Sequence, residues 1–333
     1  MKFCEKDKCF FISNIRMRII GTGRAHPAKV VTNAMLEQFL DTSDEWIKER
    51  TGMSERRVIT SEKLEDLAAD AARRAIEDAG IEPTDIDYII CSNVVNEYVT
   101  PGLSCIIQGK VGAKCACVDV NAACSGFIYA LDMADDRIRS GKAKNILVVA
   151  AEEPTRMVDW NDRSTCVLFG DGAGAVVVTG GKGLLCSRLT TVSKTDCLYY
   201  ERKLEPTPYI TKEESSGPMY MNGREVFKTA VLSSSYDIKR LLDKAGLKPG
   251  DVKYYLLHQA NMRIIEAIAH QLQLDMSYFP HNVDYCGNTS SASVALLLDE
   301  LHRDGKIQNG DKLVMSAFGA GFTTGACIIE WNK

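Results

Sequence analysis

The segment DVNAACSGFIYAL, residues 119–131, places a cysteine where a predicted strand meets a predicted helix. Residues 115–120 favour a strand, whereas Phe127 and Leu131 begin an apolar stripe with helical spacing. Cys124 therefore lies beside the unpaired N–H groups that begin the helix, where the helix dipole favours a thiolate over a thiol. On this segment alone, a buried structural cysteine is the alternative to a nucleophile.

The composition is that of an ordinary soluble globular chain. It has 333 residues, of which 45% are hydrophobic and 25% are charged, and this length suggests about two domains. The net charge of −4 at pH 7 provides no basic field, so we expect no nucleic-acid partner. The longest apolar runs are too short to span a bilayer, and the first residues resemble neither an export signal nor an anchor. We therefore expect a cytoplasmic protein without membrane association.

The 12 cysteines could indicate disulfides or a metal site. In a chain of this size without an export signal, reduced thiols are the expectation. Two close pairs, Cys4 with Cys9 and Cys115 with Cys117, lack the CxxC spacing and the partner pair of a zinc site. The sequence therefore predicts no metal centre.

The second half of the chain repeats the first. Residues 79–88, AGIEPTDIDY, match residues 245–254, AGLKPGDVKY, at an offset of 166. Each half alternates predicted strands and helices, which indicates a duplication with parallel-rich sheets sandwiched by helices. We expect a short extension over residues 1–16, a first half over residues 17–183 and a second half over residues 184–333.

The duplication also relates Cys124 to an asparagine and a histidine. At an offset of 164, Cys124 corresponds to Asn288; at an offset of 166, Ser92 at the end of an apolar strand corresponds to His258 at the end of another. Such related ends can converge near a pseudo-twofold axis, so Cys124, His258 and Asn288 form one candidate site. A nucleophilic cysteine needs a neighbouring base or cation, and an asparagine adds a neutral donor.

Each of these residues has a plainer alternative. A single histidine after a strand is often a satisfied structural residue, and an asparagine between glycine and threonine is typical of a turn. The order Cys, His, Asn also fits a papain-like protease, but that family needs a CGSCW-type flank. The flanks of Cys124 are Ala-Ala and Ser-Gly.

Three motifs carry a family resemblance: VNAACSGF at residues 120–127, LHQANMRII at residues 257–265 and GNTSSAS at residues 287–293. They resemble the active-site motifs of 3-oxoacyl-acyl-carrier-protein synthase III, the condensing enzyme that initiates type II fatty-acid synthesis. The motifs DTSDEWIKERTG, FGDGAGA and FGAGF strengthen the resemblance, which covers about residues 17–333. It implies an α/β thiolase fold, duplicated and five-layered in the order α-β-α-β-α.

The resemblance assigns chemical roles by position. Cys124 would take an acyl group from acyl-CoA as a thioester, and His258 and Asn288 would hold the thioester carbonyl of malonyl-carrier protein while carbon dioxide leaves. The backbone N–H groups of Cys124 and Ala320 would form the oxyanion hole. The family usually has three glycines at residues 319–321, where this chain has GAG, and the amide donor survives the methyl group unless the backbone needs a positive φ. Acyl-CoA and malonyl-carrier protein are then substrates, and no cofactor or metal is expected.

The resemblance also implies a coenzyme A channel. Trp46 and Arg163 would sandwich the adenine, with an aromatic face opposite a guanidinium plane. Taken alone, Trp46 is equally a helix-core residue and Arg163 a solvated loop charge. The other implied substrate-binding residues are Arg50, Thr51, Met221, Gly223, Phe227, Ala260 and Asn261.

Partners follow from the same resemblance. Arg263, Arg224 and Lys228 would offer cations to an acidic acyl carrier protein, although such a cluster is also typical of a solvated surface. A homodimer is expected, and Thr100 stands where short-chain members carry a phenylalanine that is contributed across the dimer. The smaller threonine predicts a primer longer or more branched than acetyl.

Several functions share parts of this pattern. The leading interpretation is initiation of fatty-acid synthesis, and the alternative is starter-unit condensation or loading for a polyketide or another secondary metabolite. 3-Hydroxy-3-methylglutaryl-CoA synthase shares the cysteine and histidine but needs an acidic base, and the HQAN and GNT motifs argue against it. An inactive scaffold or partner subunit would be expected to lack the nucleophile, whereas Cys124 is present.

Overall fold

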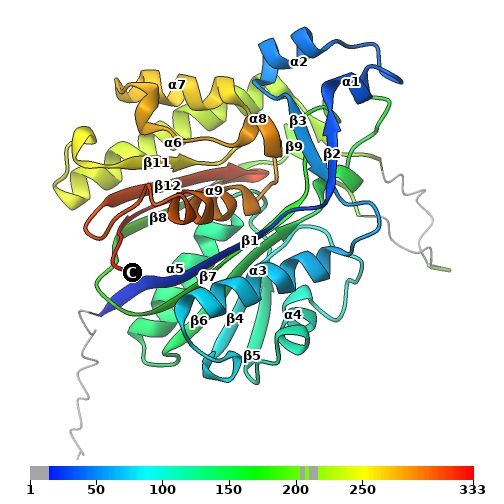
Figure 1. The fold of residues 1–333 in the computed structure, drawn as a ribbon. Helices are drawn as coiled ribbons and strands as arrows, with labels where there is room; N and C mark the ends of the chain where they lie inside the picture. The colour runs from blue at the N-terminus through cyan, green and yellow to red at the C-terminus, as the bar shows by residue number, and fades with distance from the viewer. Residues whose placement is uncertain (1–14, 203–206, 210–216) are drawn as a thin grey trace, which may run out of the picture.

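Two mixed β-sheets lie one above the other with two helices between them (Figure 1). The computed structural model describes residues 15–202, 207–209 and 217–333, so most of the expected N-terminal extension, residues 1–14, lies outside the described part. In spatial order the first sheet comprises β1 (Arg16–Ala25), β7 (Gly172–Gly181), β6 (Asn145–Glu152), β4 (Tyr88–Ser92) and β5 (Ala116–Val120). The second sheet comprises β11 (Tyr254–Leu257), β12 (Lys312–Gly319), β13 (Gly321–Glu330) and β8 (Leu184–Lys194).

Helices form three layers around these sheets. α3 (Leu64–Ala79) and α4 (Leu103–Val111) bury their apolar faces on the outer side of the first sheet. α5 (Gly126–Arg139) and α9 (Ala292–Arg303) share one core between the two sheets, and α6 (Gly223–Ala245) and α7 (Met262–Leu272) cover the outer side of the second. This order is the predicted five-layered α-β-α-β-α architecture. None of the helices in the described ranges is long and apolar enough to cross a membrane.

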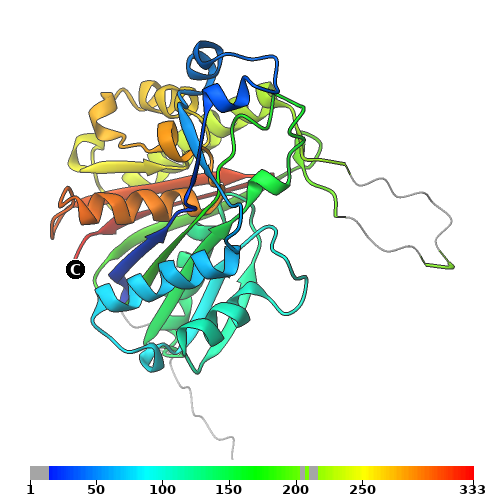
Figure 2. The same cartoon turned by 45° about the vertical axis from the view of Figure 1, so that its right-hand side comes forward.

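The helix α2 (Asp44–Thr51) belongs to the first half of the sequence but packs beside the second. The side-chain amide of Asn261, at the start of α7, donates to the carbonyl of Arg50 at 3.1 Å. In Figures 1 and 2 the blue α1 and α2 accordingly lie at the side of the second half. The smaller elements are α1 (Asn33–Leu36), α2 (Asp44–Thr51), α8 (Val283–Cys286), β2 (Lys29–Thr32), β3 (Glu55–Val58), β9 (Leu198–Tyr199) and β10 (Tyr220–Met221).

The two halves repeat each other in local detail. α3 and α6 both end at a glycine with left-handed backbone, since φ is 66° at Gly80 and at Gly246. A 3-10 turn that opens with a proline, Pro83 or Pro249, then leads into β4 or β11. Every strand of the first sheet precedes residue 184, and every strand of the second begins at or after it. We propose the boundary between the two halves there.

The expectation of parallel-rich sheets is wrong. β4 is parallel to β5 and β6, and β11 is parallel to β12, but β1, β7, β8 and β13 all join their sheets antiparallel. Parallel neighbours need a crossover connection, usually a helix. β12 and β13 are instead joined by a tight turn at Ala320, and the described segment 153–171 between β6 and β7 contains no crossover helix.

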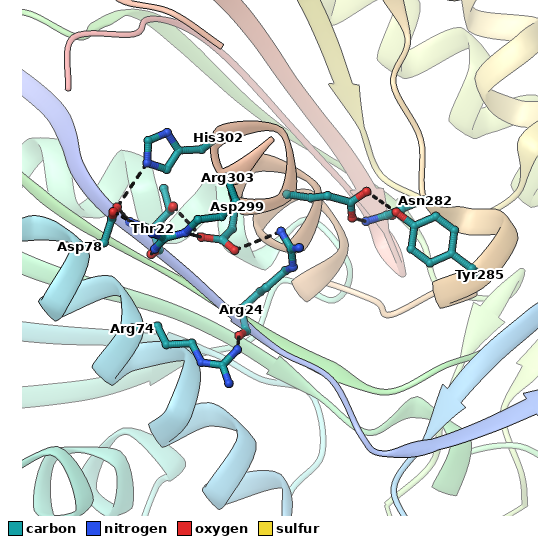
Figure 3. A network of polar contacts seen from close by, with 10 residues as sticks. Thr22, Arg24, Arg74, Asp78, Asn282, Tyr285, Asp299, His302 and Arg303 are labelled. Carbon is teal, nitrogen blue, oxygen red and sulfur yellow. Dashed lines mark hydrogen bonds and ion pairs between the residues drawn. The ribbon is translucent and has the colours of Figure 1, made fainter. Parts of the chain in front are cut away.

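A polar network holds α9 against the first half of the molecule (Figure 3). Asp299 on α9 accepts a hydrogen bond from the Thr22 hydroxyl at 2.7 Å and pairs with Arg24 at 3.2 Å, both on β1. Asp78 on α3 accepts from the Thr22 backbone N–H at 2.9 Å and pairs with Arg303 on α9 at 3.1 Å. The network therefore fixes α9, and Asn288 and Ser290, which precede this helix, line the cavity described next.

Candidate active site

One cavity of about 970 Å³ brings the three predicted catalytic residues together. Cys124 comes from the first half, between β5 and α5, whereas His258 follows β11 and Asn288 precedes α9 in the second half. Ala320, in the turn between β12 and β13, also lines the cavity. The described residues contain no cluster of three or more His, Cys, Asp or Glu side chains placed to hold a metal ion.

Cys124 follows a turn with left-handed backbone, since φ at Ala123 is 48°. The Ser290 hydroxyl donates a hydrogen bond to Cys124 Sγ at 3.4 Å. Burial raises the pKa of the Cys124 thiol to about 12, despite that hydrogen bond. Burial thus opposes the thiolate that the helix start favours. Attack by this sulfur requires a group that takes the thiol proton.

The surroundings of His258 keep its imidazole neutral and select one tautomer. Its Nδ1 lies 2.8 Å from the Ser293 hydroxyl, which also accepts from the Gln259 backbone N–H at 3.3 Å. The serine hydrogen is thus available to Nδ1, and this bonding pattern assigns the ring hydrogen to Nε2. Burial lowers the pKa of His258 to about 3, and the ring of Phe318 lies edge-on with centroids 5.1 Å apart. A neutral imidazole of this tautomer can donate a hydrogen bond through Nε2.

Asn288 is held by the backbone of the FGDGAGA motif. Its N–H donates to the Leu168 carbonyl at 2.8 Å, and its carbonyl accepts from the Gly170 N–H at 3.1 Å. The side-chain oxygen Oδ1 accepts from the Ser290 backbone N–H at 2.9 Å. That bond leaves the side-chain NH₂ group as the donor for a ligand in the cavity. His258 and Asn288 therefore offer two uncharged donors.

The turn after β12 approaches the cysteine closely because residue 319 is a glycine. A Cβ atom at Gly319 would lie 2.6 Å from the backbone nitrogen of Cys124 and 2.8 Å from Ala123 Cβ. This approach sets the turn that carries Ala320 beside the Cys124 amide. The φ of Ala320 is not positive, so its methyl group brings no left-handed strain at the position where the resemblance led us to expect glycine.

Gly319→Ala is expected to slow transfer of an acyl group to Cys124 by about tenfold to a hundredfold. The added methyl group would displace the Cys124 amide, and outright removal of one oxyanion-hole donor costs about 10²–10³ in rate. Rapid-quench measurement of the acyl adduct by mass spectrometry gives the rate. Gly250→Ala is the matched control, since nothing lies within 4 Å of a Cβ there. An unchanged rate in Gly319→Ala would contradict this role of the close approach.

The residues predicted for the pantetheine part of the channel all line the cavity, namely Met221, Gly223, Phe227, Ala260 and Asn261. Phe227 is 38% exposed, so it lies where the cavity opens to solvent. Arg224 and Lys228 are its exposed neighbours on α6, and exposed Arg263 follows Asn261 on α7. The three predicted docking cations therefore lie beside the cavity mouth, and their role stays a prediction.

The predicted adenine site is the gap between Trp46 and Arg163, and this gap is narrower than an adenine ring needs. The guanidinium carbons of Arg50 and Arg163 lie 4.8 Å and 5.1 Å from the centroid of the Trp46 ring. Arg163 also pairs with Asp41 at 3.3 Å. An aromatic ring does not fit between Trp46 and Arg163 at this separation, because stacking on both faces needs a wider gap. The sandwich stays a prediction that requires Arg163 to move outward.

Two predicted residues lie away from the cavity wall. Thr51 is 3% exposed at the end of α2, and its hydroxyl donates to the Ile47 carbonyl at 2.6 Å. The assignment of Thr51 to the nucleotide end of the channel stays a prediction, and in this structure its hydroxyl is already bonded within α2. Thr100 is exposed, and within this chain its neighbours Tyr98 and Val99 line the cavity instead.

Sequence reasoning missed three polar residues around the site. Ser290 contacts Cys124, Ser293 contacts His258, and the buried carboxylate of Glu152 lies behind them. The two serines belong to the GNTSSAS motif, so their spacing from Asn288 could have singled them out. Glu152 directly follows an apolar run, and only the burial of its carboxylate distinguishes it from the adjacent glutamate.

Sequence comparisons place this chain in a known family. Residues 118–196 match the profile of 3-oxoacyl-[acyl-carrier-protein] synthase III, and residues 242–331 match the profile of its C-terminal part. Beta-ketoacyl-[acyl-carrier-protein] synthase III of Clostridium acetobutylicum is 44% identical over 322 residues, which cover 95% of this chain and 99% of that protein. The protein of the same name from Aquifex aeolicus is 43% identical over 318 residues, which cover 94% of this chain and 99% of that protein.

Solved structures agree with these sequence matches. The crystal structure of the synthase III from Aquifex aeolicus superposes with a TM-score of 0.89 at 42% identity, covering 95% of this chain and all 100% of that one. The priming beta-ketosynthase of the R1128 polyketide pathway gives a TM-score of 0.89 at 34% identity and covers 96% and 97% of the two chains. The five layers are thus those of the thiolase fold. From its sequence, its layers and the contents of its cavity, this chain belongs to the 3-oxoacyl-[acyl-carrier-protein] synthase III family of condensing enzymes.

Proposed function

We propose that this enzyme condenses an acyl-CoA primer with malonyl-acyl carrier protein, releases coenzyme A and carbon dioxide, and so initiates type II fatty-acid synthesis. The observation that carries the proposal is the single cavity in which one thiol, Cys124, faces two uncharged donors, His258 and Asn288. This combination suits acyl transfer to sulfur followed by formation of an enolate. Neither donor brings a positive charge that would hold the malonyl carboxylate and oppose its loss.

The first half-reaction charges the cysteine. Cys124 Sγ attacks the thioester carbonyl carbon of the acyl-CoA, and the backbone N–H groups of Cys124 and Ala320 stabilise the oxyanion. Collapse of the tetrahedral intermediate breaks the bond to the coenzyme A sulfur. The primer then remains on Cys124 as a thioester.

The second half-reaction forms the carbon–carbon bond. His258 Nε2–H and the Asn288 NH₂ group donate to the thioester oxygen of the malonyl-carrier protein. The carbon–carbon bond to the malonyl carboxylate breaks, carbon dioxide leaves, and the electron pair passes into the enolate. The enolate carbon attacks the acyl-Cys124 carbonyl, and the sulfur leaves as the 3-oxoacyl product forms. The proposed reaction uses the two substrates and the chain's own residues, without a cofactor.

Two macromolecular contacts accompany this proposal. The cations Arg224, Lys228 and Arg263 beside the cavity mouth suit an acidic carrier protein that delivers its malonyl group. β5 is an edge strand of the first sheet, and Val99 near the cavity is 72% exposed. We assign these features to a homodimer, which would cover the edge strand and bring the partner's loop to the primer pocket. The proposed substrates, acyl-CoA and malonyl-acyl carrier protein, support a cytoplasmic location.

The direct test is incubation with a panel of acyl-CoAs from acetyl to decanoyl, followed by malonyl-carrier protein. Intact-protein mass is expected to show a single acyl adduct that malonyl-carrier protein discharges, with 3-oxoacyl-carrier protein as the product. Primers of about six to ten carbons are expected to react faster than acetyl-CoA because of Thr100; the opposite order would overturn only the primer assignment. If no acyl-CoA labels the protein, the priming step proposed here is wrong.

Starter-unit condensation for a secondary metabolite is the second candidate, because the R1128 priming ketosynthase shares the fold at 34% identity. The 44% identity to the Clostridium acetobutylicum enzyme favours fatty-acid synthesis. Both functions use the same half-reactions and differ in the carrier protein that receives the product. Neighbouring genes that encode polyketide tailoring enzymes would favour the second candidate.

A further inference from the structure

We propose that Arg56, on β3, is a positioning residue for the second half-reaction, because it holds the segment that fixes Asn288. Arg56 is not among the residues that line the cavity, so it acts through the backbone of its neighbours. This inference rests on the proposed function, since it concerns the donor that Asn288 offers to the developing enolate.

The guanidinium of Arg56 is buried against uncharged acceptors. The side chain is 0% exposed, and it donates to the carbonyls of Val31 at 3.2 Å and Val167 at 2.8 Å and to Asn33 Oδ1 at 2.8 Å. Within the described ranges none of these partners is a carboxylate, and the Arg56 Nε has no hydrogen-bond partner. Burying a charge in this way is costly, which points to a task beyond packing.

The contact at Val167 leads directly to Asn288. The carbonyl of Leu168, the next residue along the chain, accepts from the Asn288 N–H at 2.8 Å, and the Gly170 N–H donates to the Asn288 carbonyl at 3.1 Å. Phe169 and Asn288 thus form a parallel bridge between the two segments. A guanidinium that fixes Val167 therefore fixes the backbone from which the Asn288 side chain reaches the cavity.

Two glycines allow Arg56 to approach this bridge. A Cβ atom at Gly287 would lie 3.0 Å from Arg56 Cβ, and one at Gly170 would lie 3.3 Å from it and 2.1 Å from the Cys286 carbonyl oxygen. These glycines belong to the GNTSSAS and FGDGAGA motifs. The aliphatic stem of Arg56 therefore packs on both segments of the bridge.

Asn33 orients the guanidinium at its other end. Asn33 is 1% exposed, and its side-chain NH₂ group donates to the Met53 carbonyl at 2.8 Å and to Asp44 Oδ1 at 2.9 Å. These bonds leave Asn33 Oδ1 as the acceptor for Arg56. The planar fork of Arg56 thus spans two anchored acceptors, Asn33 and Val167, and sets their separation.

The two half-reactions separate a positioning role from a general role in stability. Arg56→Met keeps a long side chain but removes the fork. Single-turnover discharge of the hexanoyl-enzyme by malonyl-carrier protein is expected to slow by about tenfold to a hundredfold, since a displacement of about 1 Å can have an effect of that size. Acylation of Cys124 by hexanoyl-CoA is expected to stay close to the wild-type rate, because Asn288 is not part of the oxyanion hole for acyl transfer.

A double-mutant cycle shows whether Arg56 acts through Asn288. In an Asn288→Ala background the donor is already absent, so adding Arg56→Met is expected to change the discharge rate by less than about twofold. A substitution that only loosened the fold would slow both backgrounds by the same factor. Arg57→Met is the matched control, because Arg57 is the next residue on β3 and its side chain points to the other face of the strand. Its discharge rate should equal that of the wild type.

Arg56→Lys is a second variant for the case that Arg56→Met does not fold, which thermal melting of each variant shows. Lysine keeps the charge but cannot bond Asn33 and Val167 with a planar fork, so discharge is expected to slow here as well. Wild-type discharge by either folded Arg56 variant would overturn the positioning role and leave the condensing function intact. Equal slowing of both half-reactions, or of both backgrounds, would do the same. Failure of the wild-type protein to take any acyl group would overturn the function itself.

Discussion

Replacement of Cys124 by alanine is expected to abolish the acyl adduct with every acyl-CoA. Cys124 is the cysteine that lines the cavity together with His258, Asn288 and the turn at Ala320. Alanine keeps a small side chain just before α5 but removes the sulfur that is proposed to form the thioester. Intact-protein mass after incubation with the primer panel measures the effect, and condensation activity should be lost with the adduct.

The control for this prediction is a cysteine at the surface. Cys105 is exposed and can react non-specifically with an activated thioester. Cys105→Ala is therefore expected to keep the single adduct at the wild-type rate. An adduct of the same mass on Cys124→Ala would contradict the assignment of the nucleophile.

His258→Ala and Asn288→Ala are each expected to separate the two half-reactions. The acyl adduct should still form on Cys124, because neither side chain belongs to the proposed oxyanion hole for acyl transfer. Its discharge by malonyl-carrier protein should slow by about 10²–10³, the usual cost of removing one donor to a developing enolate or oxyanion. Single-turnover discharge of the isolated acyl-enzyme measures this step.

The neutrality of His258 adds a pH test to the same experiment. Since burial lowers its pKa to about 3, His258 stays uncharged from pH 5 to 8. We therefore expect no titration of a histidine in the discharge rate over that range. His270→Ala, at an exposed position on α7, is the matched control. If His258→Ala lost acylation as severely as discharge, the assigned division of roles would be wrong.

Local sequence patterns are sufficient to predict some of the helices around the site. The helix over residues 44–51 begins after Ser43, whose side chain accepts from the Trp46 N–H, and it ends at Gly52 with φ of 77°. α3 occupies residues 64–79, as its apolar spacing and closing glycine predict. These features depend on neighbours a few residues apart, so a single sequence is enough to predict them.

The duplication and the motifs predicted features that local patterns cannot, namely the two related halves and the family. The repeat over residues 79–88 and 245–254 predicted two related halves, and the three motifs predicted the family that the comparisons show. Strand direction could not be predicted in this way. Whether β7 or β13 returns antiparallel depends on the path of the chain between strands, and alternating apolar residues look alike in either direction.

The sequence by itself determined the layer order, the family and the three residues proposed for catalysis. Only the tertiary structure decided how those residues ionise. A helix start predicts a thiolate at Cys124, but enclosure by both halves raises the pKa of the thiol to about 12 and lowers that of His258 to about 3. The same enclosure buries the Glu152 carboxylate and raises its pKa to about 7. Burial is the sum of contacts from segments more than a hundred residues apart, so no local pattern in the sequence encodes it.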